Sequence, residues 1–190
     1  MLPKTPKIKR NKTADEALTS LMRLCARAER SSGDALRLMQ NWGVAKEEQY
    51  GVLRKLQSER FIDDRRYAET FIREKCNLSA WGRYKIQSAL KRKGIASDII
   101  AEALTELNPT DNKKRLQDKL QTKIKHIKYD TAYQLKTKLI RYALSLGFEM
   151  DEVMDCVNEI IKNNNVFVRK SFAMGHPYEK RYYLEGRKIR

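Results

Sequence analysis

The stretch LKRKGI at residues 90–95 contains a glycine followed by an apolar residue, and the same pair occurs at Gly43-Val44 and Gly147-Phe148. The three glycines are 51 and 53 residues apart. A repeat of this length indicates a stack of similar helical units rather than one globular core around a catalytic cleft. Each glycine fits the position just after a helix, where a left-handed backbone costs a residue with a Cβ about 1 kcal/mol or more.

Small or apolar residues recur at fixed distances from these glycines, at eight and four positions before each and at nine and ten positions after. They are Ala35, Met39, Val52 and Leu53 around the first glycine, Ile86, Leu90, Ala103 and Leu104 around the second, and Leu139, Ala143, Cys156 and Val157 around the third. Such spacing is typical of the buried face of two helices around a turn. The sequence therefore predicts an elongated all-α body.

The chain is expected to contain three tandem three-helix repeats between two basic tails. The expected ranges are a tail over 1–12, repeats over 13–60, 61–108 and 109–162, and a tail over 163–190. Thr13 to Glu16 has the pattern of a capping box at the start of a helix. Asp63 is expected to cap a helix that runs through Lys75. The run Asn163-Asn164-Asn165 is expected to end the last helix.

The net charge of +16 is concentrated at the ends of the chain. Residues 1–12 carry +5 and residues 163–190 carry another +5, so the 150 residues between them hold only +6. Within the third repeat, residues 112–146 contain ten Lys or Arg and two acids, whereas 149–159 contain five acids and no base. This distribution favours an acidic or polyanionic partner, most simply nucleic acid. Ordinary solvated helix surface is the alternative interpretation.

The three cysteines, Cys25, Cys76 and Cys156, are far apart in sequence and lie on apolar helix faces. We interpret them as reduced core residues of a cytoplasmic protein. The two histidines and the absence of a Cys-x-x-Cys motif argue against a zinc site. No glycine-rich phosphate loop, nucleophile pair or acidic metal cluster is present, so we expect neither a cofactor nor enzyme activity. No apolar run is long enough to cross a membrane.

The stretch from Phe61 to Arg73, followed by Gly82 to Ile86 and Leu90 to Ile95, resembles the central signature of the RecX regulatory proteins. The resemblance covers about residues 14–162 and is strongest in the middle repeat. Asp34 stands where this family usually has glutamate, and Ala35 where it usually has leucine.

The resemblance implies an elongated, curved protein that regulates the bacterial RecA recombinase. Proteins of this family lie in the groove of the RecA–DNA filament and lower its ATPase, strand-exchange and coprotease activities. It also implies a partner, the RecA filament, with single- or double-stranded DNA as a second contact. The chain itself is expected to be a monomer.

The contact candidates are the basic residues of the second and third repeats. They are Arg65, Arg66, Arg73, Arg83, Lys85, Lys91 and Arg92 in the second, and Lys113, Lys114, Arg115, Lys119 and Lys123 in the third. Five cations of the second repeat are too many for internal pairs to satisfy all of them: Arg65, Arg66, Arg73, Arg83 and Lys85. Some must therefore face solvent or a partner.

The C-terminal tail mixes aromatic and basic residues, which suits single-stranded nucleic acid because bases stack on rings while cations hold phosphates. The tail candidates are Phe167, Arg169, Lys170, Arg181, Tyr182, Tyr183 and Arg187. The alternative interpretation is a partly disordered tail that packs a few of its aromatic residues on the third repeat. A second hypothesis follows from these patterns, in which the chain is a general DNA-binding protein that uses tandem three-helix units. It predicts tight DNA binding without RecA and a steep dependence on salt.

Overall fold

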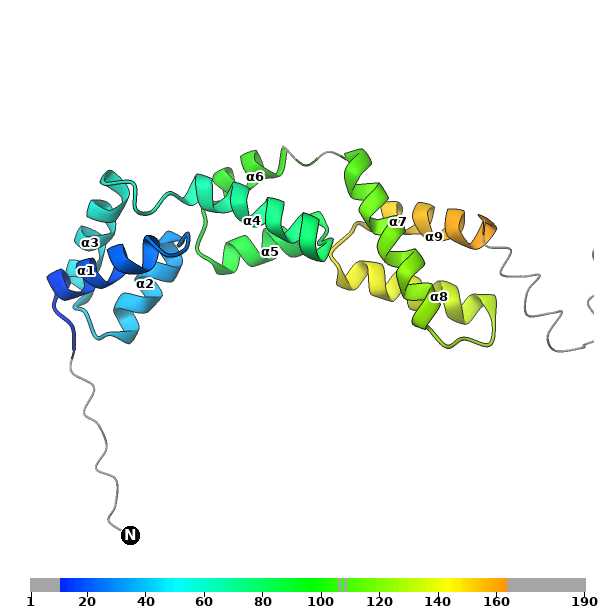
Figure 1. Cartoon of the computed structure of the whole chain (residues 1–190), viewed down its shortest axis with the longest axis horizontal. Helices are drawn as coiled ribbons and strands as arrows, with labels where there is room; N and C mark the ends of the chain where they lie inside the picture. The colour runs from blue at the N-terminus through cyan, green and yellow to red at the C-terminus, as the bar shows by residue number, and fades with distance from the viewer. Residues whose placement is uncertain (1–10, 106, 108, 164–190) are drawn as a thin grey trace, which may run out of the picture. The chain divides into compact units, whose positions relative to one another are not determined.

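The computed structural model describes residues 11–105, 107 and 109–163, and within these ranges every regular element is an α-helix. The chain divides into two compact units after residue 108. The first unit contains helices α1 to α6 and the second contains α7 to α9 (Figure 1). The predicted all-α fold of three-helix groups is confirmed for the described part of the chain.

The first three-helix group consists of α1 (Ala14–Cys25), α2 (Ser32–Asn41) and α3 (Lys46–Ser58). The capping box predicted for α1 is present, because the Thr13 side chain accepts a hydrogen bond from the Glu16 backbone and the Glu16 side chain accepts one from the Thr13 backbone. Helix α3 packs against both α1 and α2. Their apolar faces form one core around residues such as Leu21, Met39 and Leu56.

The second group consists of α4 (Asp64–Ser79), α5 (Arg83–Arg92) and α6 (Ser97–Thr105). Asp63 caps α4 as predicted, and its carboxylate accepts hydrogen bonds from two backbone N–H groups of the first turn. The predicted end of this helix at Lys75 is wrong. The helix continues to Ser79 because Ala80, rather than a glycine, takes the left-handed conformation that ends it, with φ 49°.

The second unit is one three-helix group, α7 (Pro109–His126), α8 (Ala132–Ser145) and α9 (Met150–Asn163). Pro109 occupies the first position of α7, where its missing N–H costs no helical hydrogen bond. Helix α9 ends at Asn163, the first residue of the asparagine run that was expected to end this helix. Each of the three helices packs on the other two.

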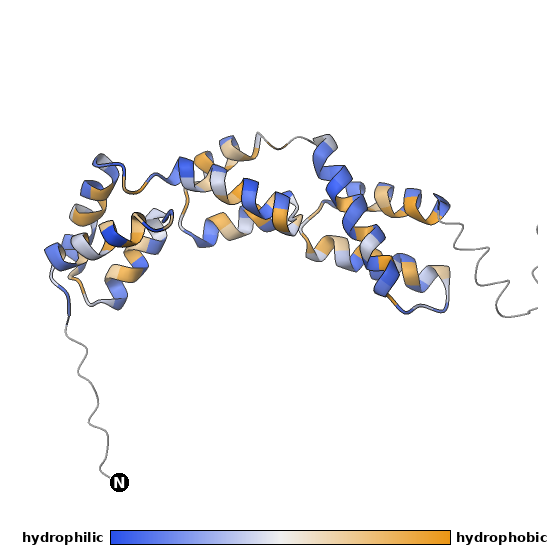
Figure 2. Ribbon diagram, in the orientation of Figure 1, coloured by the Kyte–Doolittle hydropathy of each residue, from blue (hydrophilic) through white to orange (hydrophobic). Residues whose placement is uncertain are grey.

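The repeated glycines have the backbone that the sequence predicted. Gly43, Gly94 and Gly147 have φ values of 71°, 76° and 87°, each just after a helix. All twelve residues at the four repeated offsets are buried. Figure 2 shows the result, in which hydrophobic residues gather on the inner sides of the helices and hydrophilic residues on the outer sides.

The three cysteines are free thiols, with Cys76 and Cys156 buried and Cys25 half-buried. Burial raises the pKa of the Cys25 and Cys156 thiols. A raised pKa keeps a thiol protonated and unreactive. Their burial, and the raised thiol pKa of Cys25 and Cys156, agree with the interpretation of the cysteines as packing residues.

Candidate partner-binding surface

The two three-helix groups of the first unit meet where the start of α2 faces the end of α5. Ser31, the residue that caps α2, is fully buried. Its hydroxyl accepts a hydrogen bond from the Asp34 N–H (3.1 Å) and donates one to the carbonyl of Lys93 (2.8 Å). One serine therefore caps a helix of the first group and binds the backbone of the second.

Two glycines allow the backbones to approach closely at this junction. A Cβ on Gly33 would lie 2.2 Å from the carbonyl oxygen of Lys93, and a Cβ on Gly94 would lie 2.9 Å from the Cα of Gly33. Real Cβ atoms do not approach other atoms so closely, so a side chain at either position would push the groups apart. Gly94 therefore ends α5 and also makes room for α2.

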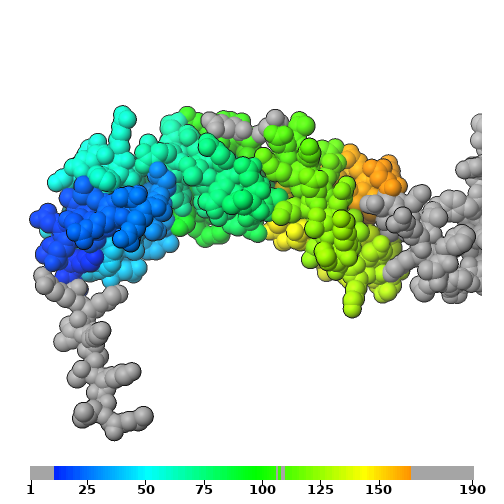
Figure 3. All heavy atoms as spheres, viewed as in Figure 1, coloured from blue at the N-terminus to red at the C-terminus, as the bar shows by residue number. Residues whose placement is uncertain are grey.

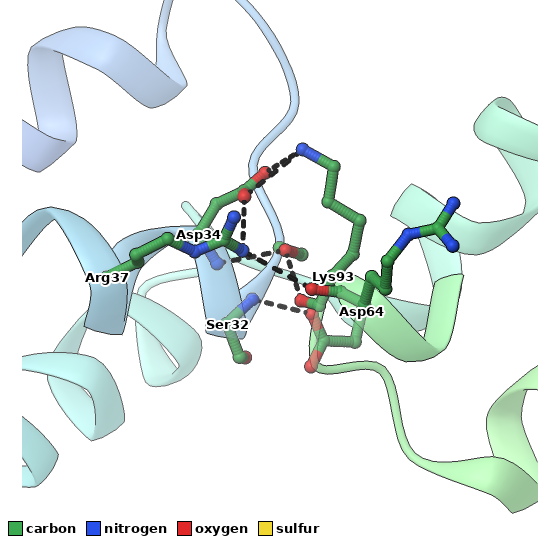
Figure 4. Close-up of polar contacts among 7 residues, drawn as sticks. Ser32, Asp34, Arg37, Asp64 and Lys93 are labelled. Atoms are coloured by element: carbon green, nitrogen blue, oxygen red, sulfur yellow. Dashed lines mark hydrogen bonds and ion pairs between the residues drawn. The ribbon is translucent and has the colours of Figure 1, made fainter. Parts of the chain in front are cut away.

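Charged side chains close the junction around Asp34, whose side chain is only 12% exposed (Figure 4). The ammonium of Lys93 lies 2.8 and 3.1 Å from the two Asp34 oxygens, and Arg37 lies 3.0 Å from one of them. On the other side, the N–H of Ser32 donates to the carboxylate of Asp64 at 2.8 Å. A low-exposure carboxylate with two cationic partners satisfies the requirement that buried charge be paired.

Arg66 forms a further link between the same two groups. Its guanidinium donates two hydrogen bonds to Glu29, at 2.7 and 3.1 Å, and one to the carbonyl of Arg60. The hydrogen bond to Glu29 raises the pKa of Arg66. Arg66, a predicted contact residue, thus already has a partner across the junction. Its hydrogen bonds hold the two helical groups together.

The other predicted cations of the second group differ in how far they are already paired. Arg65 forms an ion pair with Glu102 of α6. The Lys85 ammonium lies 4.8 Å from the centre of the Trp81 ring, within reach of a cation–π interaction. The remaining four are exposed, and among the described residues they take part in none of the ion pairs: they are Arg73 on α4 and Arg83, Lys91 and Arg92 on α5.

The predicted cations of α7 lie on two sides of that helix. Lys113 pairs with Glu159 of α9 at 2.9 Å, which raises the pKa of Lys113 and lowers that of Glu159. Lys114 is exposed, and three others are half-buried at successive turns of the helix, Arg115, Lys119 and Lys123. The Lys123 ammonium lies 5.1 Å from the centre of the Tyr142 ring on α8. This side of α7 therefore faces α8.

Three further cations near Lys123 were not among the predicted candidates. Lys128, Lys138 and Arg141 line a surface cavity of about 370 Å³ together with Lys123 and Ile127. The excess of basic residues over 112–146 was the available signal, but it does not tell which of the ten lie together. The junction residues Ser31, Gly33 and Asp34 were missed for a similar reason, since their partners lie about sixty residues away.

The two predicted basic tails lie almost entirely outside the described ranges, and so does every nucleic-acid candidate of the C-terminal tail. Among the described residues, no group of three or more His, Cys, Asp and Glu side chains could hold a metal ion. The helices of the same ranges include none that is long and apolar enough to cross a membrane.

Comparison with known proteins gives one consistent family. Residues 63–104 match the model of the second three-helix domain of RecX. The chain is 33% identical over 103 residues to the regulatory protein RecX of Clostridium botulinum, an alignment that covers 53% of this chain and 48% of that protein. It is 28% identical over 144 residues to that of Haemophilus influenzae, covering 75% of this chain and 93% of that protein. The chain thus spans about half the length of the clostridial relative.

Two solved structures share the fold. A crystal structure of regulatory protein RecX aligns with a TM-score of 0.65 at 22% identity, over 79% of this chain and 71% of that one. RecX from Lactobacillus salivarius aligns with the same TM-score at 21% identity, over 77% of this chain and 95% of that one.

Proposed function

Because this chain belongs to the RecX family, we propose that it is a non-enzymatic regulator that binds the RecA–DNA filament and lowers its activities. The observation that carries the proposal is the family match over residues 63–104, which spans α4 to α6. The proposal covers the ATPase, recombinase and coprotease activities of RecA, and through them DNA repair and the SOS response. Such a regulator acts in the cytoplasm, as a monomer, with single- or double-stranded DNA as a second contact.

The junction supports this proposal because it holds two helical groups as one piece. A surface that is already ordered loses little conformational freedom on binding, which favours affinity for a large, repetitive partner such as a filament. The exposed cations Arg83, Lys91 and Arg92 belong to this piece. We propose that they contact the filament, and that the groups act as the repeats predicted over 13–60, 61–108 and 109–162.

The proposal is tested by titrating the protein into RecA on single-stranded DNA and measuring ATP hydrolysis. We expect slower hydrolysis when the protein is present at less than one copy per RecA. Unchanged hydrolysis at every ratio would contradict the proposal.

A pair of matched variants then tests the surface. R83Q/K91Q/R92Q removes three exposed cations of α5, and K46Q/R54Q/K55Q removes three exposed cations of α3. We expect only the first variant to need a higher concentration for half-maximal inhibition. Equal inhibition by both variants would mean that α5 does not contact the filament.

A further inference from the structure

We infer that the cavity between α7 and α8 binds the phosphodiester backbone of nucleic acid. Four of its five lining residues are cations, Lys123 and Lys128 from α7 and the loop after it and Lys138 and Arg141 from α8. The inference extends the DNA contact included in the proposed function, and it does not depend on any action on RecA. Figure 3 shows α7 exposed on the visible face of the second unit.

Two of the four cavity cations, Lys138 and Lys123, make contacts that orient their ammonium groups. The Lys138 ammonium donates to the carbonyl of Lys128 at 2.8 Å, which leaves two of its three N–H groups for a ligand. The Lys123 ammonium stands over the Tyr142 ring. Arg141 follows Lys138 by three residues, so both lie on one side of α8. Its planar guanidinium can donate two parallel hydrogen bonds to one phosphate.

These positive charges have no acidic partner in the described part of the chain. The ion pairs there involve none of the four cavity cations. Helix α8 contains three basic residues and no acid, whereas α9 contains four acids and one lysine. The α9 residue Glu159 pairs with Lys113, on a different side of α7 from Lys123. Like charges that share a helix face repel one another, and a bound polyanion would relieve that repulsion.

The composition of the cavity favours nucleic acid over an acidic protein. The centre of a protein–protein interface is rich in aromatic and apolar residues and poor in charge. Here the single apolar lining residue is Ile127, while interfaces with DNA are strongly positive. Lys119 lies one helical turn, about 6 Å, before Lys123 and extends the cationic row along α7. A row of charges suits a ligand with phosphates at regular intervals better than one isolated anion.

The test compares two variants of the full chain that lose the same charge. K123Q/R141Q removes two cations of the cavity, and K125Q/K136Q removes one cation from each of the same two helices on other faces. Binding to a fluorescent single-stranded oligonucleotide and to a duplex is measured over a range of salt, without RecA. The basic tails are present in every protein, so their contribution cancels in the comparison.

We expect K123Q/R141Q to lower the slope of log affinity against log salt by about 1.4 on the single strand and about 1.8 on the duplex. The substrate, single strand or duplex, for which K123Q/R141Q loses more affinity is the one that the cavity prefers. K125Q/K136Q should leave the slope close to that of the wild type. R141Q alone changes one exposed side chain, and it should lower the single-strand slope by about 0.7.

Equal slopes in the two double variants would overturn the inference, because the cavity would then contribute no more than any other charge. The same holds if K123Q/R141Q binds DNA like the wild type yet fails to inhibit RecA, since the cavity would then bind an acidic protein surface. If no protein inhibits RecA but the slopes differ as expected, the proposed function fails and the cavity inference stands.

Discussion

The two units use their positive charges in different ways. In the first unit, Lys93 and Arg66 connect one helical group to the other through Asp34 and Glu29. In the second unit, the cations around the α7–α8 cavity lie together with no acid among the lining residues. A count of basic residues alone therefore does not identify a binding surface. What matters is whether a carboxylate lies within reach of each cation.

The largest expected effect is that of breaking the junction with one methyl group, in Gly33→Ala. Gly33 is part of α2, so helix propensity alone predicts that alanine stabilises the protein by about 1 kcal/mol. Its Cβ would lie 2.2 Å from the Lys93 carbonyl oxygen, and relieving that overlap requires the two groups to separate. We expect a net loss of about 1 to 3 kcal/mol in the free energy of unfolding, measured with urea.

Gly51→Ala is the matched control for this change. Gly51 is also inside a helix, α3, but a Cβ there meets no atom within 4 Å. This variant should gain about 1 kcal/mol, because only the helix propensity changes. If both variants were stabilised, the close approach of Gly33 and Lys93 would not exist in solution.

A smaller loss is expected when the junction keeps its shape but loses its charge, in Asp34→Ala. The substitution leaves Lys93 and Arg37 without their shared carboxylate. We expect a loss of about 1 to 2 kcal/mol, since Lys93 is partly exposed and water can replace some of the lost contact. Thermal and urea unfolding measure it.

Asp118→Ala makes the same chemical change on an exposed face of α7 in the second unit. It should be neutral or slightly stabilising, because alanine favours helix more than aspartate does. A loss in Asp118→Ala as large as that in Asp34→Ala would show that the junction charges contribute nothing particular.

The fold could be predicted largely because its signals are local. The side chains of Thr13 and Asp63 cap the helix that follows them, and a pattern of a few residues is enough to recognise them. The one helix end that was predicted wrongly, that of α4, depends on tertiary context. Ala80 adopts a left-handed backbone that usually favours glycine.

The candidate site was less predictable because its contacts join distant parts of the sequence. The Ser31 hydroxyl reaches the carbonyl of Lys93, 62 residues later in the chain. No periodic pattern encodes such a contact. The predicted list therefore included Arg66, which pairs across the junction, and omitted Lys128, Lys138 and Arg141, which gather only when α7 folds against α8.

A double-mutant cycle can sharpen the difference between two neighbouring arginines, Arg66 and Arg65. Arg66 donates two hydrogen bonds to Glu29 across the junction, and the pair is partly shielded from solvent. We expect a coupling free energy of about 0.5 to 1 kcal/mol between Arg66→Ala and Glu29→Ala. The corresponding cycle for Arg65 and Glu102, which are both well exposed, should give no measurable coupling. Equal couplings would remove the distinction between a junction pair and a surface pair.

The smallest effect is expected at the exposed pair that links α7 to α9. The hydrogen bond from Lys113 lowers the pKa of Glu159, so its contribution to stability is present above the ordinary glutamate pKa and disappears as the pH falls through the lowered value. Glu159 in turn raises the pKa of Lys113. The contribution of Lys113 to stability is therefore present below the ordinary lysine pKa and disappears as the pH rises through the raised value. The ion pair therefore stabilises the fold fully between about pH 4.3 and 10.4.

In urea unfolding, Glu159→Gln should be slightly less stable than the wild type within this window and equal to it at lower pH. Because both side chains are exposed, 1 M salt should remove most of the difference at neutral pH. A difference that persists in acid or in high salt would mean that Glu159 contributes through packing rather than through its charge, and the second unit would then resemble the junction of the first.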